Sequence, residues 1–206
     1  FDGIFIAISN PVDIIAHYIY KLSGLPKNQV IGTGTAIDSA RLQNMIAQTV
    51  NVDPRSVHAY SMGEHGDSQM VPWSTVTIAG KPFYDVIADN KELVGDVDLD
   101  ELVYRTTQEG WEIFNRKGTT YYGIATACVG VIKAILNDEN RIIPVSTLLE
   151  GEYGERNVYA GVPTVLNRSG AYDVLEIHMT PGELARFKES TRVIREYTDR
   201  IMKLNL

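Results

Sequence analysis

The sequence predicts an α/β fold, in which the end of a parallel α/β layer is followed by a larger α+β region. Residues 1–9 form an apolar run typical of a buried strand, and residues 12–25 then repeat apolar side chains at helical spacing before a second short strand at 29–35. Residues 141–177 are typical of short strands separated by glycine turns. The first strand, helix and strand therefore predict the parallel α/β layer, and the meander predicts the α+β region.

The remaining elements follow from hydrophobic periodicity and capping residues. We expect a helix from Asp38, a strand, loop and strand over residues 58–80, a solvated loop that becomes a helix over 90–118, and another helix over 121–137. Thr180 is followed three residues later by a glutamate, which predicts a capping box at the start of a last, amphipathic helix.

The composition is that of an ordinary globular protein and excludes some partners. A formal net charge of -7 argues against binding to nucleic acid, which needs a basic face. The single cysteine cannot form an internal disulfide, which favours a reducing compartment such as the cytoplasm. The longest apolar runs are shorter than the ~20 residues that a membrane helix needs, so we expect no membrane partner.

The glycines of "GTGTAI" begin like a dinucleotide-binding fingerprint, because they follow a strand and precede a helix. The position that requires a third small residue is occupied by Ile37, whose side chain obstructs close packing of helix and strand. We therefore predict a tight turn here, and a phosphate-binding loop elsewhere if the protein uses a nicotinamide cofactor.

The stretch "GEHGDS" at residues 63–68 carries the strongest chemical signal. Glycines on both sides of the acid–histidine pair allow the His65 ring to approach another group closely. The sequence offers His65 no second ligand at metal spacing and no G-x-S-x-G serine motif, so an imidazole that needs a carboxylate partner remains. Asp38 is a candidate for that partner or, alternatively, a plain helix N-cap. Arg41, on the same helical face, is suited to pairing with Asp38 or to binding a substrate carboxylate.

Six stretches together resemble a known family. "ISNPVD", "VIGTGTAIDSAR", "VHAYSMGEHGDS", "VPWS", "KGTTYYGIA" and "GVPTVLNRSG" are similar, in order and spacing, to the L-lactate dehydrogenases of the lactate/malate dehydrogenase superfamily. The resemblance covers essentially the whole chain. It implies the final strands of a Rossmann dinucleotide-binding domain at residues 1–33 and an α+β catalytic domain at residues 34–206.

The resemblance also implies a role for individual residues. His65 would exchange a proton with the C2 oxygen of the substrate, with Asp38 as its carboxylate partner, and Arg41 would hold the substrate carboxylate. Asn10, before a cis proline, would bind near the reacting carbonyl and the nicotinamide. The resemblance places Thr120 in the substrate pocket and Ile124 against the nicotinamide ring. The implied cofactor is NAD, and no metal is implied.

Further expectations concern the molecule as a whole. The motifs of the family's first half, including its glycine fingerprint and mobile loop, are not in the sequence, so we expect these 206 residues by themselves to be inactive. The family forms dimers and tetramers, which implies a cytoplasmic homo-oligomer. Fructose-1,6-bisphosphate-activated members pair a histidine, which matches His58, with an arginine where this chain has Gln43, so we expect no such activation.

Alternatives remain open at this point. Gly110 stands where many lactate dehydrogenases have alanine, so a branched substrate, as in L-2-hydroxyisocaproate dehydrogenase, is one alternative and malate is another. A second class is a non-catalytic half that only forms an oligomer interface, through Tyr197 and Ile201 for example. A third is a cofactor-free hydrolase, for which Ser68 is the nearby hydroxyl.

Overall fold

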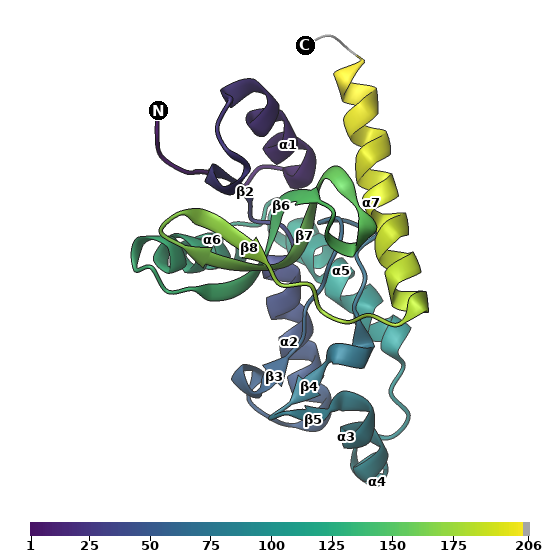
Figure 1. Cartoon of the computed structure of the whole chain (residues 1–206). Helices are drawn as coiled ribbons and strands as arrows, with labels where there is room; N and C mark the ends of the chain where they lie inside the picture. The colour runs from purple at the N-terminus through teal and green to yellow at the C-terminus, as the bar shows by residue number, and fades with distance from the viewer. Residues whose placement is uncertain (204–206) are drawn as a thin grey trace.

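The centre of the molecule is a five-stranded sheet in the order β1-β2-β6-β7-β8 (Figure 1). The computed structural model describes residues 1–203. β1 and β2 are parallel, and the later neighbours are antiparallel. The strands are β1 (Phe5–Ala7), β2 (Val30–Gly32), β6 (Arg141–Glu150), β7 (Arg156–Asn167) and β8 (Gly170–Val174). This mixed sheet, with helices packed on it, confirms the predicted α/β fold class.

Five long helices and a small second sheet complete the fold. The long helices are α1 (Val12–Ser23), α2 (Ala36–Val50), α5 (Leu99–Lys117), α6 (Tyr122–Leu136) and α7 (Pro181–Met202). At the far end of α2 lie β3 (Val57–His58), β4 (Thr77–Ile78), β5 (Lys81–Pro82), α3 (Phe83–Asp89) and α4 (Lys91–Val94) (Figure 1). Short 3-10 turns occupy Lys27–Gln29, Pro54–Ser56, Trp73–Thr75 and Glu152–Gly154. Within residues 1–203, none of the helices combines the length and apolarity needed to cross a membrane.

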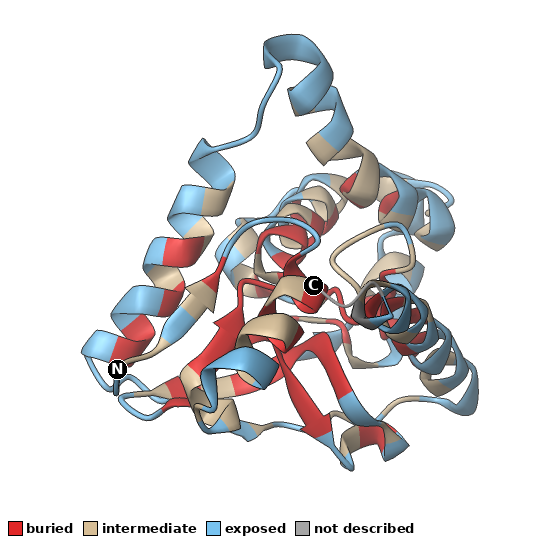
Figure 2. Cartoon of the chain, turned by 90° about the horizontal axis from the view of Figure 1, so that it is seen from above, coloured by how far each residue is buried: buried red, intermediate tan, exposed pale blue. Residues whose placement is uncertain are grey.

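The central strands are buried because helices pack on them from several directions, whereas the outer helix faces are exposed (Figure 2). Separate apolar clusters join the sheet to α1, to α6 and to α7. Phe187 and Ile194 of α7, for example, pack with Leu149 of β6. Burying each such side chain contributes roughly 1.5–3 kcal/mol, so these contacts hold the helices in fixed positions on the sheet. The predicted capping box at Thr180 is present and begins α7.

The acidic stretch departs from the prediction of a loop. The chain is helical in α3, for which no element was predicted from the sequence, and in α4, where a solvated loop was expected. Phe83 is only 1% exposed and, with Val86 and Ile87 at helical spacing, packs on the cluster around α2 and Trp73. This i, i+3, i+4 pattern of apolar residues was the available signal for the helix. It was overlooked because the pattern is short and is surrounded by charged residues.

The meander also differs, because its strands are long. β6 and β7 span 10 and 12 residues, where the sequence analysis expected short strands separated by glycine turns. Gly161 lies inside β7 and not in a turn. A side chain does not fit there, because a Cβ at this position would lie 2.5 Å from Thr35 Oγ1. The glycine therefore marks a close approach between β7 and the segment before α2.

The division expected between residues 33 and 34 lies between two strands of one sheet. Gly32 of β2 pairs with Ser146 of β6, so the first part of the chain and the antiparallel strands share hydrogen bonds. Because β2 and β6 lie on the two sides of the expected boundary but belong to one sheet, the division into two domains stays a prediction.

Gly34 begins the turn between β2 and α2, and we expect its replacement by alanine to destabilise the protein. Its φ of +51° disfavours a side chain, and an added Cβ would lie 2.3 Å from the backbone nitrogen of Ser146. The free energy of unfolding of Gly34→Ala should fall by about 3 kcal/mol or more in urea denaturation. Gly24→Ala is the matched control, because Gly24 has φ +68° and open space around its Cβ. Equal losses in the two variants would contradict the clash.

Candidate active site

The loop that carries His65 is held against two elements. Gly63, with φ +91°, exchanges backbone hydrogen bonds with Gly161 of β7, at 2.9 and 2.7 Å. A Cβ on Gly63 would lie 2.2 Å from Ser190 Oγ of α7, and the same hydroxyl accepts a hydrogen bond from Glu64 N at 2.8 Å. The first glycine of "GEHGDS" is thus required by close packing, which fixes the direction in which His65 leaves the loop.

His65 meets Asp38, the carboxylate expected from the sequence. His65 Nδ1 lies 2.6 Å from Asp38 Oδ2. Asp38 is 2% exposed and lies in the first turn of α2, where the helix dipole stabilises a negative charge. The N-cap of α2 is Thr35, so the alternative reading of Asp38 as an N-cap is wrong. The helix starts two residues earlier than predicted, which places the carboxylate beside the imidazole.

Arg41 follows Asp38 by one turn of α2. Its Nη1 lies 3.6 Å from Asp38 Oδ1, and its side chain is 12% exposed. Asp38 therefore has a cation near each of its oxygens. Because Arg41 keeps further N–H donors beyond this one contact, it is able to bind a second carboxylate.

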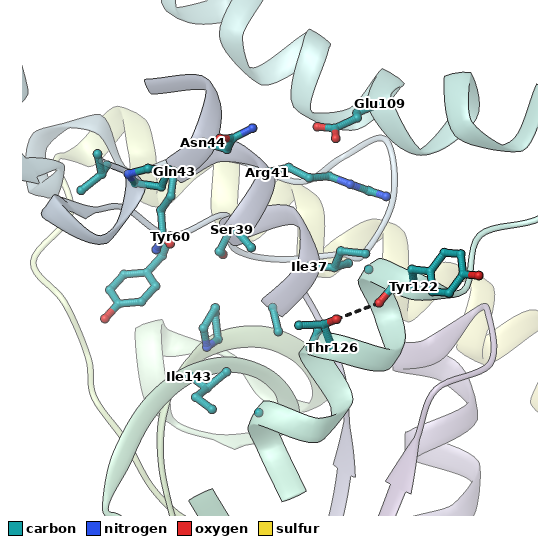
Figure 3. Close-up of a pocket in the computed structure, with 18 of the residues that line it drawn as sticks. Ile37, Ser39, Arg41, Gln43, Asn44, Tyr60, Glu109, Tyr122, Thr126 and Ile143 are labelled. Atoms are coloured by element: carbon teal, nitrogen blue, oxygen red, sulfur yellow. Dashed lines mark hydrogen bonds between the residues drawn. The ribbon is translucent and has the colours of Figure 1, made fainter. Parts of the chain in front are cut away.

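Arg41 also lines a cavity of about 950 Å³ between α2, α5 and α6. Figure 3 shows its side chain and that of Glu109 extending into the space between α2 and α5. Thr120, expected near the substrate, lines the same cavity. Neither His65 nor Asp38 is among the described residues that line the cavity. Arg41, which contacts Asp38, is the residue of the cluster that lines it.

The surroundings of His65 favour its charged form. Burial, the largest single effect, lowers the pKa of the imidazole, but the hydrogen bond and the charge of Asp38 together with the charge of Asp13 raise it more. Arg41 opposes this in part. The pKa of His65 is raised above its ordinary value as a net result, which favours the protonated imidazole.

Asn10 lies between β1 and α1, and Ile124 lies in the first turn of α6. The Asn10–Pro11 peptide is cis, as predicted, and leads from β1 into α1. Asn10 is exposed, and Ile124 is half-buried in the first turn of α6. Neither contacts His65 or Arg41 through a hydrogen bond in the described part of the chain, so their expected contact with a cofactor stays a prediction.

Ser68 shapes the loop instead of acting as a nucleophile. Its hydroxyl donates to Glu64 Oε2, and its backbone nitrogen donates to the same atom. Ser190 Oγ lies 3.1 Å from the hydroxyl. These partners, and not His65, surround the Ser68 oxygen, so the geometry gives no support to the hydrolase alternative.

One buried acid of this region, Asp13, was not predicted from the sequence. Its Oδ2 accepts a hydrogen bond from His65 N at 3.0 Å, although it is 3% exposed within the apolar part of α1. An acid at a buried helix position was the available signal. Its contact with the His65 backbone was not predictable, because 52 residues separate the two in sequence.

Comparison with known proteins places the chain in a family. Residues 35–204 match the family described as lactate/malate dehydrogenase, alpha/beta C-terminal domain. The chain belongs to this family. L-lactate dehydrogenase 3 of Bacillus cereus is 52% identical over 197 residues, which are 96% of this chain and 62% of that protein. L-lactate dehydrogenase 1 of Bifidobacterium longum subsp. longum is 46% identical over 202 residues, which are 98% of this chain and 64% of that protein.

Solved structures of the lactate/malate dehydrogenase family have the same fold. The minor L-lactate dehydrogenase from Enterococcus mundtii in the ligands-bound form superimposes with a TM-score of 0.93 at 41% identity, over 98% of this chain and 64% of that one. These matches confirm the resemblance found in the sequence. The chain spans just under two thirds of the length of the relatives, at 62% and 64%.

Proposed function

We propose that the protein interconverts a small 2-oxo acid and the corresponding L-2-hydroxy acid, with pyruvate and L-lactate as the main pair. The cluster of His65, Asp38 and Arg41 carries this proposal, because it combines a proton donor with a carboxylate-binding arginine. Reduction of pyruvate needs a hydride at C2, a proton at the carbonyl oxygen and an anchor for the carboxylate. The relatives named L-lactate dehydrogenases support the same reaction.

The chain's own residues supply the proton and the anchor. Arg41 binds the substrate carboxylate through two parallel hydrogen bonds, which orients the carbonyl. His65 gives its proton to the carbonyl oxygen during reduction, and Asp38 stabilises the charged imidazole before that transfer. In the reverse direction the neutral imidazole accepts the hydroxyl proton.

NAD is the cofactor that we propose, and NADH supplies the hydride when it is bound. The carboxyl ends of the parallel strands β1 and β2 lead to Asn10 and to the turn before α2, which is the edge where α/β sheets bind such ligands. The exposed Asn10 side chain fits the nicotinamide amide, and Ile124 fits an apolar ring face. No phosphate loop is proposed in these residues, since "GTGTAI" departs from the fingerprint.

A larger substrate is the second candidate, and Gly110 favours it. A Cβ at Gly110 would lie 3.2 Å from Arg41 Nη1, which is a tight contact, so the glycine lets α5 approach the proposed carboxylate anchor closely. Because α5 carries no methyl group at this position, we propose that a branched 2-oxo acid such as 4-methyl-2-oxopentanoate is also accepted beside Arg41. One methylene changes discrimination by only about 1–3 kcal/mol, so we propose a broad preference for monocarboxylic acids.

Oxidation of NADH by the protein expressed from its complete coding sequence tests the function. We expect turnover with pyruvate and with 4-methyl-2-oxopentanoate, and little with oxaloacetate. Gly110→Ala should lower the relative rate with the branched acid by about 10-fold or more while pyruvate reduction continues. The 206 residues alone are expected to be inactive. The absence of turnover with all three acids would rule out the proposed reaction.

Assembly and regulation complete the proposal. We propose a cytoplasmic homo-oligomer, with the half-exposed Tyr197 of α7 in an interface. Fructose-1,6-bisphosphate activation is not proposed, because Gln43 carries no charge and its amide donates to Ala59 O at 3.0 Å. The non-catalytic alternative, in which the chain only supplies an interface, leaves the paired His65 and Asp38 without a purpose.

A further inference from the structure

A second, smaller cavity lies between α1, the start of β7 and α7, three elements that pack on one another. Its volume is about 200 Å³. The described residues that line it are His17 and Lys21 of α1, Asn157 and Val158 of β7, and Arg195, Thr198 and Asp199 of α7. None of them lines the larger cavity around Arg41, so this cavity is separate from the proposed active site.

His17 is a buried polar side chain without a partner. It is 3% exposed, and its Nδ1 forms no hydrogen bond with any of the described residues. Burial and the charge of Lys21 lower the pKa of His17 to about 4, and the charge of Asp199 opposes them. The ring is therefore neutral near pH 7, with one nitrogen that donates and one that accepts. Because buried polar groups are normally hydrogen-bonded, the ring indicates a bound partner in this cavity.

The charged residues of the cavity are mainly cations. Lys21 and Arg195 are positive, and Asp199 is the one acid among the described residues that line it. Asp199 is exposed, so solvent screens its charge. Arg195 uses Nη2 for both Glu155 Oε2 at 2.8 Å and Arg156 O at 3.1 Å. Its Nε and Nη1 have no partner within residues 1–203, so the guanidinium keeps donors for a further group.

The donors of the cavity match an oxyanion. Lys21 Nζ donates to Asn157 Oδ1 at 3.3 Å, which leaves the other ammonium protons and the amide nitrogen of Asn157 as donors. An ammonium, a guanidinium and an amide from three elements are suited to a tetrahedral group that accepts on every side. At ~30 Å³ for each water molecule the volume holds about six waters. A phosphate or sulfate therefore fits inside, whereas a whole nucleotide does not.

We propose that this cavity binds a small oxyanion of the phosphate class, held by Lys21 of α1, Arg195 of α7 and the buried ring of His17. The inference goes beyond the proposed function and does not depend on it. Lys21 and Asn157 are exposed, so the anion enters from solvent, either as free phosphate or as the phosphate group of a small ester. A bound anion connects α1 to α7 and stabilises their packing.

Two substitutions remove the proposed contacts one at a time. Lys21→Gln removes a charge at an exposed position, and His17→Phe replaces the ring nitrogens by an apolar ring. Lys188→Gln is the matched control, because Lys188 is an exposed lysine of α7 that does not line the cavity. All variants are made in the protein expressed from its complete coding sequence. Circular dichroism and urea unfolding show that each is folded before it is measured.

The first readout is the NMR signal of the His17 ring during titration with inorganic phosphate at constant pH and ionic strength. We expect a saturable shift, and a higher pKa of His17 in the bound state, because the anion favours the charged imidazole. Lys21→Gln should weaken phosphate binding by about 10-fold or more, and Lys188→Gln by less than twofold. Equal affinity in wild-type and Lys21→Gln proteins would overturn the proposal.

Calorimetry gives the second readout, since it needs no histidine signal. Phosphate binding that is present in wild-type and Lys188→Gln proteins should be lost in His17→Phe. If His17→Phe retains the same binding, the anion lies elsewhere and the proposal fails. Glycerol 3-phosphate is titrated in parallel: tighter binding than phosphate identifies an ester as the source, and equal or weaker binding identifies the free anion. No response of His17 to either probe at about 10 mM would mean a cavity filled only by water, which overturns the proposal.

Discussion

His65→Asn is expected to lower kcat for pyruvate reduction by about 10²- to 10⁴-fold, with the fold retained. Asparagine keeps a polar group near Asp38, but its amide cannot give up a proton to the carbonyl oxygen. In the wild-type protein kcat/KM for reduction should fall as the pH rises through the pKa of His65, which is raised above 6.5. In the variant this fall should disappear. Steady-state kinetics between pH 5 and 9 measures both effects.

His178→Asn is the control for that result, because His178 is exposed and lies outside the proposed site. It should retain wild-type kinetics. A His65→Asn variant with wild-type kcat would mean that the proton comes from solvent or from another group. A variant that loses turnover and also loses its cooperative unfolding transition would place His65 in the core instead of the chemistry.

Arg41→Lys is expected to lower kcat/KM by about 10²- to 10³-fold, and Arg41→Gln by about 10³-fold or more. Lysine retains the charge but loses the two parallel hydrogen bonds to the substrate carboxylate. Glutamine also leaves the 2% exposed Asp38 with one cation fewer. Most of the loss should appear in KM, because the carboxylate is bound in both the ground state and the transition state.

Arg116→Gln provides the comparison, since Arg116 is an exposed arginine on α5 that forms an ion pair with Glu112 and with no other acid within residues 1–203. This substitution should change kcat/KM by less than twofold. Binding of oxamate, which has the carboxylate of pyruvate beside an amide, gives a readout that does not depend on turnover. Equal oxamate affinity in wild-type and Arg41→Gln proteins would contradict the carboxylate anchor.

Much of the site was predictable because its signals are local. Asp38 and Arg41 lie three residues apart on one helix, and spacing alone puts them on the same face. His65 was distinguished by the glycines beside it, and the structure explains the first of them through the contact of Gly63 with Ser190. The pairing of His65 with Asp38 could not be predicted from spacing alone. It was expected because an imidazole that transfers protons needs a carboxylate partner.

What sequence patterns left out depends on contacts between distant segments. Asp13 looks like a misplaced acid in an apolar helix until the fold brings the His65 backbone to it. Gly161 is typical of a turn in the sequence, but in the structure it is required because Thr35 occupies the space that a Cβ would need. The helix at Phe83 is held by burial against a cluster whose members come from elsewhere in the chain. In each case tertiary packing, and not local propensity, decides the conformation.

The placement of Asp38 and Arg41 on one helix has a consequence for how this site can change. The helix α2 holds Asp38, the partner of His65, and Arg41, the proposed carboxylate anchor, at a fixed separation, whereas Glu109 and Gly110 belong to α5 and Thr120 to the segment before α6. Residues on α5 can therefore be exchanged for ones of other size or charge while proton transfer stays intact. Libraries that diversify α5 and leave α2 untouched are the natural route to dehydrogenases for other 2-oxo acids.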